Sequence, residues 1–393
     1  MMELYTCPSC RTRGMQVFHQ TESVPTNSCI LLGSREEALA YPCGRIELAF
    51  CPACGFISNM TFDGKLTEYS ERYEETQGFS ETFNAFHRKL AQRLIERYDL
   101  HDKDVLEIGC GKGEFIALLA ELGGNRGVGF DPGYREERTA NALSERLKFV
   151  KDFYSEKYSS YQADFVCCKM TLEHIHPVSQ FMATVRRAIG DRHDTVVFFQ
   201  IPEVLRIVRD CAFEDIYYEH CSYFSPGSLG RLFRQNDFDV LNLETEYASQ
   251  YLTIEAKPSR GMPTAPLAQE DDLALLARYV AEFPSKCQTK LDEWRLKIRE
   301  TRGCGRKIVL WGSGSKAVSF LTTLGVGDSI EYAVDINPYR HGYYMPTTGQ
   351  RIVSPDFLKE YQPDVVIIMN AVYRDEIARD LDRMSLRPEI LAL

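Results

Sequence analysis

Seven residues around the first glycine cluster have the types and spacing of a ligand-binding turn. The string is Glu107-Ile108-Gly109-Cys110-Gly111-Lys112-Gly113; a short apolar stretch precedes it, and an apolar, helix-like run over residues 114–120 follows. A strand, a glycine turn and a helix are typical of a nucleotide-binding α/β fold, because glycine lets the backbone approach a ligand and the helix start offers it free N–H groups. A tight turn in an unspecific α/β domain is the alternative interpretation.

A second acid follows at the spacing that a bound nucleoside requires. Asp131 ends the next predicted strand, residues 126–130, where its carboxylate can accept hydrogen bonds from ribose hydroxyls. With Glu107 inside the glycine turn, this arrangement favours S-adenosylmethionine over NAD as the ligand. We therefore predict that Glu107 and Asp131 bind the donor, together with Gly109, Gly111 and Gly113.

Two cysteine pairs near the N-terminus have the spacing of metal knuckles. Cys7-Pro8-Ser9-Cys10 is the first pair and Cys51-Pro52-Ala53-Cys54 is the second. Four thiolates in two tight turns match a tetrahedral zinc site, and four thiolates leave no open coordination position, so we predict a structural zinc ion. A redox pair or an empty ribbon are the alternatives; Cys43 could compete as a ligand but has no partner at this spacing.

A third segment combines aromatic, acidic and basic groups. Residues 215–225 read DIYYEHCSYFS, with Tyr217, Glu219 and His220 among them. A histidine titrates near neutrality and can remove a proton next to a carbonyl, an adjacent carboxylate can orient it, and tyrosine hydroxyls can stabilise the resulting enolate. Alternatively, His220 is a satisfied core histidine. The Glu173-His174-Ile175-His176 run is interpreted as a loop that lines the cofactor pocket, with metal binding as a minor alternative.

The surrounding sequence predicts the elements that hold these groups. Helical spacing of apolar residues indicates a helix over 78–98. Short, nearly continuous apolar runs predict buried parallel strands, and two late runs predict a closing hairpin. The expected strands are 104–108, 126–130, 147–151, 164–168, 194–200, 237–246 and 250–256. A long charged helix over about 269–302, with a kink at Pro284, follows as a connector.

The strand, glycine turn and helix pattern occurs again near the C-terminus. Residues 308–316 read IVLWGSGSK and precede an apolar helix, and Asp335 ends the next strand about twenty residues later. The repeated layout indicates a second α/β unit that is too short for a complete copy of the first. It either supports the structure or helps to hold the substrate.

Composition excludes several classes of function. The chain has 393 residues, which predicts two or three domains, and a net charge of −10 argues against a general nucleic-acid binder. The sequence contains no signal-peptide pattern and no run of membrane-spanning length, so we expect a cytoplasmic protein that neither enters a membrane nor binds nucleic acid. Four of the 13 cysteines form the two Cys-x-x-Cys pairs, which indicate metal or redox chemistry rather than a disulfide framework.

Taken together, these motifs resemble the sugar C-methyltransferases of deoxysugar biosynthesis, of the tetronitrose C-methyltransferase type. The resemblance rests on the cysteine knuckles, residues 107–113, the Tyr217–His220 string and the C-terminal glycine turn, in that order. It implies an α/β fold: a class I SAM-methyltransferase (Rossmann-like) core, an N-terminal zinc-binding domain and a C-terminal Rossmann-like α/β domain. The expected boundaries are 1–62, 63–257, 258–303 for the helical connector, and 304–393.

The resemblance also implies roles for individual residues. His220 would be the general base beside a keto group, and Glu219, Tyr217 and Tyr73 would lie with it in the pocket. Asp152 and Phe153 follow the third strand, where this fold usually contacts adenine. The substrate would be a nucleotide-linked keto-deoxysugar held between the central and C-terminal domains, methylated in line on the enolate carbon by S-adenosylmethionine.

Three departures from the family pattern weaken the sugar assignment. Tyr218 stands where a histidine is often found, residues 369–373 lack an expected Trp-Asn pair, and the stretch 27–42 is long. Two alternatives therefore remain. The chain could be an O- or N-methyltransferase of a natural-product or surface-glycan pathway, or a non-catalytic zinc-ribbon binding protein.

Overall fold

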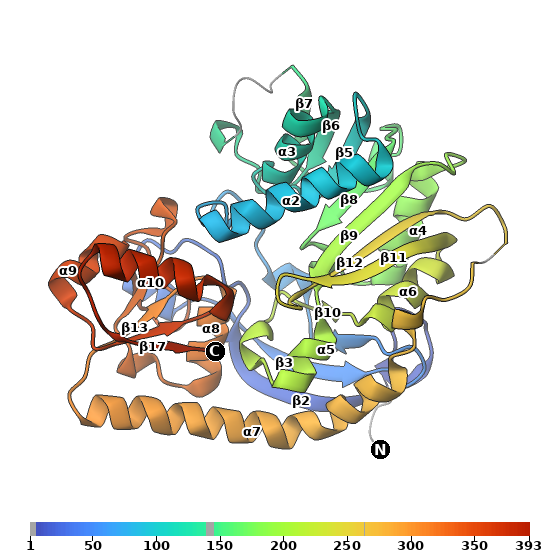
Figure 1. Ribbon diagram of the computed structural model, residues 1–393. Coiled ribbons are helices and arrows are strands. Elements are labelled where there is room, and N and C mark those ends of the chain that lie inside the picture. Colours follow the sequence, from blue (N-terminus) through green and yellow to red (C-terminus); the bar gives the residue numbers. More distant parts are fainter. Residues whose placement is uncertain (1–4, 139–144, 263) are drawn as a thin grey trace.

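The computed structural model describes residues 5–138, 145–262 and 264–393 and contains three β-sheets (Figure 1). The sheets follow one another along the chain, with one exception. A single short strand from the sequence that forms the central sheet joins the first sheet instead. We call them the N-terminal, central and C-terminal sheets. None of the helices that the structure describes is long and apolar enough to cross a lipid bilayer.

The N-terminal sheet is antiparallel and has the order β1-β2-β3-β4-β10. Its last strand, β10, comes from the aromatic segment at 215–225 and pairs with β4 through Ser222 and Tyr223. The zinc-knuckle region and the predicted catalytic segment are therefore tied by backbone hydrogen bonds. The strands are β1 (Tyr5–Thr6), β2 (Arg13–Pro25), β3 (Cys43–Phe50), β4 (Ile57–Asn59) and β10 (Ser222–Tyr223), and the short helix α1 (Arg35–Leu39) lies between β2 and β3.

The central sheet has the order β11-β12-β9-β8-β5-β6-β7, with β5 to β9 parallel and a closing antiparallel hairpin. All seven strands predicted from the sequence are present, within two residues at either end. They are β5 (Asp104–Ile108), β6 (Arg126–Phe130), β7 (Leu147–Val150), β8 (Phe165–Lys169), β9 (Val196–Pro202), β11 (Phe238–Glu246) and β12 (Tyr251–Pro258).

Helices cover both faces of the central sheet. Helices α2 (Glu81–Tyr98) and α3 (Glu114–Gly123) pack on one face, while α4 (Val178–Ile189) and α6 (Pro226–Gln235) pack on the other. Helix α2 begins three residues later than its sequence pattern indicates, because Ser80 is extended and its side chain accepts a hydrogen bond from the N–H of Phe83. Helix α5 (Val204–Asp210) follows β9.

The C-terminal sheet is parallel, with the order β15-β14-β13-β16-β17. Its first strand and helix hold the second glycine turn, as the sequence predicts. The elements are β13 (Ile308–Trp311), α8 (Ser315–Leu324), β14 (Tyr332–Val334), β15 (Arg351–Val353), α9 (Leu358–Tyr361), β16 (Val365–Ile368), α10 (Arg374–Arg383) and β17 (Glu389–Ala392).

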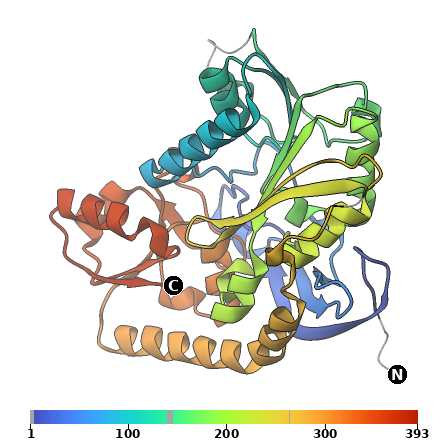
Figure 2. The same ribbon diagram turned by 45° about the vertical axis from the view of Figure 1, so that its right-hand side comes forward.

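One long helix, α7 (Leu273–Gly303), connects the central and C-terminal sheets. It continues through Pro284, and Figure 1 shows it bending, as a proline inside a helix produces. In Figure 1 the helix passes below strand β2 of the N-terminal sheet, and Figure 2 shows it below the C-terminal sheet, with its other end beside the N-terminal sheet. The helix is therefore a brace as well as a connector.

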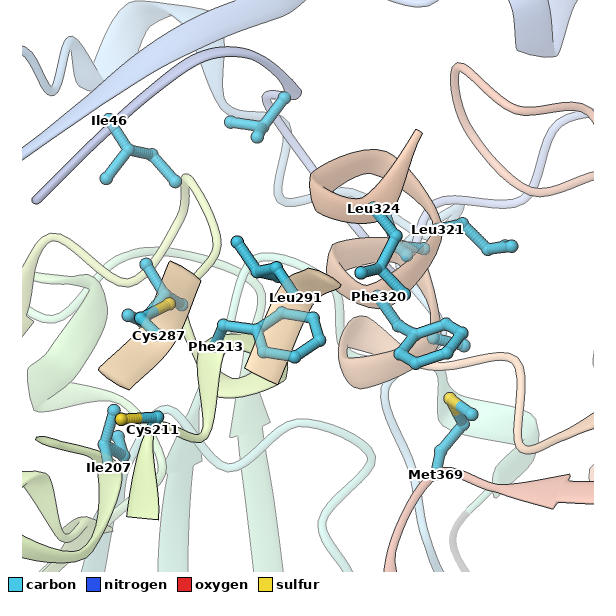
Figure 3. Packing of buried hydrophobic residues seen from close by; sticks show 14 of the residues in the cluster. Ile46, Ile207, Cys211, Phe213, Cys287, Leu291, Phe320, Leu321, Leu324 and Met369 are labelled. Carbon is cyan, nitrogen blue, oxygen red and sulfur yellow. The ribbon is translucent and has the colours of Figure 1, made fainter. Parts of the chain in front are cut away.

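A single apolar cluster joins these parts. Figure 3 shows Cys287 and Leu291 of α7 among side chains from the N-terminal sheet, from α5 and from α8. The labelled members are Ile46, Ile207, Cys211, Phe213, Cys287, Leu291, Phe320, Leu321, Leu324 and Met369. Because each buried side chain of this size contributes about 1.5–3 kcal/mol, the shared core fixes the C-terminal sheet against the rest of the molecule.

Candidate active site and metal centre

A cavity of about 640 Å³ lies between the central and C-terminal sheets. The carboxyl ends of β5, β6 and β8 open into it from one side, and the second glycine turn and α8 line it from the other. This is the edge of a parallel sheet at which α/β proteins bind ligands. Predicted site residues that line it are Tyr73, Glu107, Gly109, Gly111, Asp131, Asp152, Phe153, Tyr217 and His220.

The first glycine turn has the backbone that a close ligand contact requires. Gly109, Gly111 and Gly113 all have positive φ, at 69°, 54° and 81°. A Cβ at Gly109 would overlap Thr171, so no larger residue fits there. Gly113 caps α3 without lining the cavity, and the turn leaves the start of that helix open to it.

Two acids, the buried Glu107 and the half-buried Asp131, line the cavity beside the glycine turn. Asp131 accepts hydrogen bonds from the N–H groups of Gly111 (3.0 Å) and Gly133 (2.7 Å), which fix it beside the turn. Burial raises the pKa of Asp131 above its ordinary value, and burial raises the pKa of Glu107 to about 8. Glu107 also accepts a hydrogen bond from the N–H of Ile116 at 3.0 Å, which leaves its other oxygen for a ligand.

The predicted adenine contacts lie after β7. Phe153 is 60% exposed, and its ring meets Tyr69 edge to face at 6.2 Å. The carboxylate of Asp152 accepts hydrogen bonds from Lys157 and from the hydroxyl of Tyr158. An exposed aromatic ring at the rim of a cavity offers a flat face on which a nucleobase can stack.

His220 lines the cavity among other titratable groups. Its ring is 4.0 Å from that of Tyr217 and 4.8 Å from that of His174, centroid to centroid. Nε2 of His220 is 3.9 Å from a carboxylate oxygen of Glu173, and Nδ1 has no hydrogen-bond partner among the described residues. Burial, followed by the neighbouring His174, holds the pKa of His220 well below its ordinary value, so the ring is neutral.

Glu173, rather than Glu219, is the acid closest to this histidine. Glu173 is 1% exposed, and neither of its oxygens has a hydrogen-bond partner among the described residues. Burial raises its pKa to about 8. The sequence places Glu219 next to His220, but the chain turns between them, so adjacency in sequence did not indicate the pair.

Glu219 joins the three parts of the molecule instead. It is fully buried, does not line the cavity, and accepts hydrogen bonds from Ser28 at 2.9 Å (N–H) and 2.5 Å (hydroxyl). The Ser28 hydroxyl also lies 2.6 Å from that of Ser315, at the start of α8. Burial raises the pKa of Glu219 to about 7, although the hydrogen bonds that it accepts from Ser28 and from the side chain of Tyr73 act to lower it.

The cavity wall beside the C-terminal sheet is rich in cations. Asp215 pairs with Lys316 (2.5 Å) and with Arg206, so this triad has one net positive charge. Burial alone would raise the pKa of Asp215, but the two cations bring it below its ordinary value. Arg340 is buried nearby and donates to the carbonyls of Glu74 and Ser313, both at 2.7 Å.

The four knuckle cysteines come together as predicted. Sγ of Cys7 is 3.7 Å from that of Cys54, and Sγ of Cys10 is 3.7 Å from that of Cys51. Zinc–sulfur bonds of about 2.3 Å in a tetrahedron place sulfurs about 3.8 Å apart, so this set fits zinc. Cys43 is exposed and its thiol donates to the carbonyl of Tyr41, away from this group.

The structure also brings together a second group with metal-ligand atoms. Glu173, His174 and His220 have such atoms within 4.8 Å of one another, whereas His176 is not a member. Nδ1 of His174 is 2.9 Å from the hydroxyl of Tyr69, and burial lowers the pKa of His174 to about 4. The His-x-His spacing in the sequence therefore does not mark two ligands of one ion.

Several cavity residues were not predicted. Lys169, His87, Arg206 and Arg340 line it, and Ser28 supports it from the N-terminal region. Lys169 had a detectable signal, because a lysine that ends a fully apolar strand is unusual. The others have none, since they belong to separate elements that meet only in the folded chain.

The chain is similar to methyltransferases over most of its length. Residues 81–243 match the family described as a methyltransferase domain, and residues 253–387 match the C-methyltransferase C-terminal domain. C-methyltransferase NovU of Streptomyces niveus is 25% identical over 305 residues, which cover 74% of this chain and 72% of that protein. The central sheet is thus the class I methyltransferase fold that the sequence predicts.

Solved structures offer more distant likenesses. One is N,N-8-amino-8-demethyl-D-riboflavin dimethyltransferase of Streptomyces davawensis, with 14% identity, a TM-score of 0.37, and coverage of 44% of this chain and 55% of that one. Another is 1,6-didemethyltoxoflavin-N1-methyltransferase of Burkholderia thailandensis with bound S-adenosylhomocysteine, with 19% identity, a TM-score of 0.35, and coverage of 44% and 78%. This chain thus spans about half the length of the first.

Proposed function

We propose that this S-adenosylmethionine-dependent methyltransferase, which combines a methyltransferase domain with a C-methyltransferase C-terminal domain, methylates a carbon next to the carbonyl of a nucleotide-linked keto-deoxysugar. The observation that carries the proposal is His220, a neutral buried histidine whose Nδ1 has no partner among the described residues. It lines the cavity beside a carboxylate, Glu173.

A base at this place favours a carbon acceptor. A C–H bond beside a ketone must lose its proton before the carbon can act as a nucleophile, whereas a hydroxyl or an amine needs less help. His220 accepts this proton, and the electron pair of the C–H bond moves into an enolate with its charge on the carbonyl oxygen. S-adenosylmethionine, when bound, supplies the electrophilic methyl group that the enolate carbon takes up.

A tyrosine hydroxyl stabilises the enolate oxygen in this proposal. Tyr73 and Tyr217 line the cavity, and burial raises the pKa of each well above its ordinary value, so both remain neutral O–H donors. The hydroxyl of Tyr73 donates its proton to Glu219, so Tyr217 is the donor to the enolate oxygen in this proposal. Donors that are fixed before the charge develops stabilise a transition state more than mobile water does.

The cation-rich wall supports a phosphorylated substrate. Lys316 and Arg206 share Asp215, and the first turn of α8 presents its N–H groups on the same side of the cavity. A diphosphate is bound well by a helix start with adjacent cations. We assign this wall to the nucleotide diphosphate, which places the sugar between α8 and His220.

Zinc has a structural part in this proposal. The four knuckle sulfurs would all bind the ion, and they lie against the core of the central sheet rather than in the cavity. Arg231 of α6 donates to the carbonyl of Cys54 at 2.9 Å and ties the knuckle to that sheet. The ion would thus hold the N-terminal sheet, and with it Ser28, in register with Glu219.

The test is transfer of a ¹³C-labelled methyl group. The purified protein is incubated with labelled S-adenosylmethionine and a panel of nucleotide 4-keto-6-deoxysugars, and carbon NMR locates the label. Label on a ring carbon supports the proposal. Label on oxygen or nitrogen overturns the carbon acceptor, and the absence of label from every sugar overturns the proposed substrate class.

A further inference from the structure

We propose that Lys169 binds the α-carboxylate of the methionine part of S-adenosylmethionine. Lys169 ends β8, the strand beside the first glycine turn. Ile108 pairs with Cys168, so the next residues on the two strands, Gly109 and Lys169, are neighbours at the carboxyl edge of the sheet. Both line the cavity, so Lys169 is within the region where a donor held by the glycine turn must lie.

Lys169 is a buried cation without an acidic hydrogen-bond partner. It is 7% exposed, and its Nζ makes one hydrogen bond, to Nε2 of His87 at 2.7 Å, while the ring of Phe115 lies 4.2 Å below it. In the part of the chain that the structure describes, Lys169 forms no ion pair, although the charge of Glu107 acts on this ammonium from a longer distance. A buried ammonium has three protons to donate, so an anionic ligand would satisfy it.

The neighbours keep Lys169 charged and aimed. Burial lowers its pKa to about 8, so it remains protonated at neutral pH. Burial and the charge of Lys169 lower the pKa of His87 to about 2, and the neutral imidazole therefore acts as acceptor. His87 lies on α2, which places the ammonium between that helix and the glycine turn.

Sheet order decides which end of the donor reaches Lys169. The strands run β8-β5-β6-β7, and the predicted ribose and adenine contacts follow β6 and β7. A donor with its nucleoside over β6 and β7 crosses the glycine turn after β5 and ends over β8. The amino-acid end therefore meets Lys169 by elimination.

Glu107 completes a site for a zwitterion. Glu107 pairs with Cys167, two residues before Lys169, so the side chains of Glu107 and Lys169 leave the same face of the sheet. The methionine part of the donor has one ammonium and one carboxylate. We assign the ammonium to Glu107 and the carboxylate to Lys169.

The experiment compares two ligands that differ only in the carboxylate. Isothermal titration measures binding of S-adenosylhomocysteine and of its decarboxylated analogue to the full-length wild-type chain and to Lys169→Met. Charge-assisted hydrogen bonds predict that the substitution weakens S-adenosylhomocysteine about 10- to 100-fold and changes the analogue less than about threefold. Lys359→Met, at an exposed lysine outside the cavity lining, is the control of equal charge change and should leave both affinities unchanged.

Two results would overturn this assignment. Equal weakening of both ligands by Lys169→Met would indicate general damage to the cavity, and unchanged binding of both would remove the contact. If the variant does not fold, the wild-type protein still decides, because equal affinity for the two ligands contradicts a carboxylate subsite. This inference concerns the donor alone, so its failure leaves the proposed carbon methylation intact. If S-adenosylhomocysteine binds as expected here but no ring carbon of a sugar is labelled, the proposed function fails while the role of Lys169 stands.

Discussion

The carboxylate of Glu173 lies 3.9 Å from Nε2 of His220, and both residues are buried at the cavity. Two residues 47 positions apart thus form the pair that an acid–base mechanism requires. When His220 takes a proton, the new positive charge has an acid beside it, which stabilises the product of the proton transfer.

Glu173→Gln keeps the shape of the side chain and removes the proton that the carboxylic acid can release when His220 becomes charged. We expect kcat to fall about 10- to 100-fold with KM for the donor unchanged. The low-pH limb of the rate profile should stay in place, because burial raises the pKa of Glu173 to about 8 and this group is already uncharged where His220 titrates. Exposed Glu156→Gln is the control. A second equivalent of bound metal that disappears in Glu173→Gln would instead identify Glu173, His174 and His220 as a metal site.

His220→Ala tests the base itself. We expect turnover to fall at least about 100-fold while donor affinity changes less than about twofold, since the ring contacts of His220 are with His174, Tyr217 and Tyr223 and not with the glycine turn. The sharper readout is uptake of solvent deuterium at the carbon next to the carbonyl without a methyl donor. That exchange should vanish in His220→Ala and persist in the control His176→Ala. Persistent exchange in His220→Ala would show that another group is the base.

The cysteine centre should bind one zinc ion per chain. Cys51→Ser is expected to lose the ion and to lower the melting temperature, because a structural site contributes its binding energy to folding. Cys43→Ser, at an exposed cysteine outside the cluster, should change neither zinc content nor stability. A stable, soluble but inactive Cys51→Ser protein would contradict a purely structural ion.

The buried titratable groups predict the pH dependence of stability. Burial raises the pKa of Glu107 and Glu173 from 4.5 to about 8, so their stabilisation is complete below about pH 4.5 and is lost as the pH rises through about 8. The pKa values of His87 and His174 are lowered from 6.5 to about 2 and about 4, so their stabilisation is complete above about pH 6.5 and is lost in acid.

Between about pH 6.5 and pH 8 the two histidines no longer change protonation, whereas Glu107 and Glu173 still do, together with Glu75, Glu203 and Glu219, whose pKa values burial raises to about 7. The free energy of unfolding, measured with urea without donor, should therefore decrease across this window. Glu173→Gln should make the decrease shallower, by at most about 1.4 kcal/mol per pH unit, which corresponds to one proton. A free energy of unfolding that rises with pH in this window would exclude protonated, buried Glu107 and Glu173.

Lys316→Met tests the assignment of the cation-rich wall. Loss of one cation beside a diphosphate should raise KM for the nucleotide sugar about 10-fold and weaken inhibition by the free nucleoside diphosphate to a similar extent. Exposed Lys359→Met is the control of equal charge change. An unchanged KM for the sugar nucleotide would place the diphosphate elsewhere in the cavity.

Local patterns in the sequence determined much of the architecture. Apolar runs predicted the five parallel strands of the central sheet, because buried parallel strands must be apolar on both faces, and two late runs predicted its antiparallel hairpin. Paired knuckles predicted the cysteine cluster, since a Cys-x-x-Cys turn positions two sulfurs without help from the rest of the chain. The glycines predicted the turn after β5 in a similar way, because the positive φ angles of this turn depend only on the local backbone.

Only the tertiary structure decided which side chains work together. The sequence places Glu219 beside His220, but folding turns Glu219 toward Ser28 and brings Glu173 to the histidine instead. Lys169 meets His87, and Lys316 meets Asp215, across elements that lie far apart in the chain. Backbone geometry at neighbouring residues fixes local turns, whereas contacts between distant residues depend on how whole sheets and helices pack, and no short stretch of sequence records that packing.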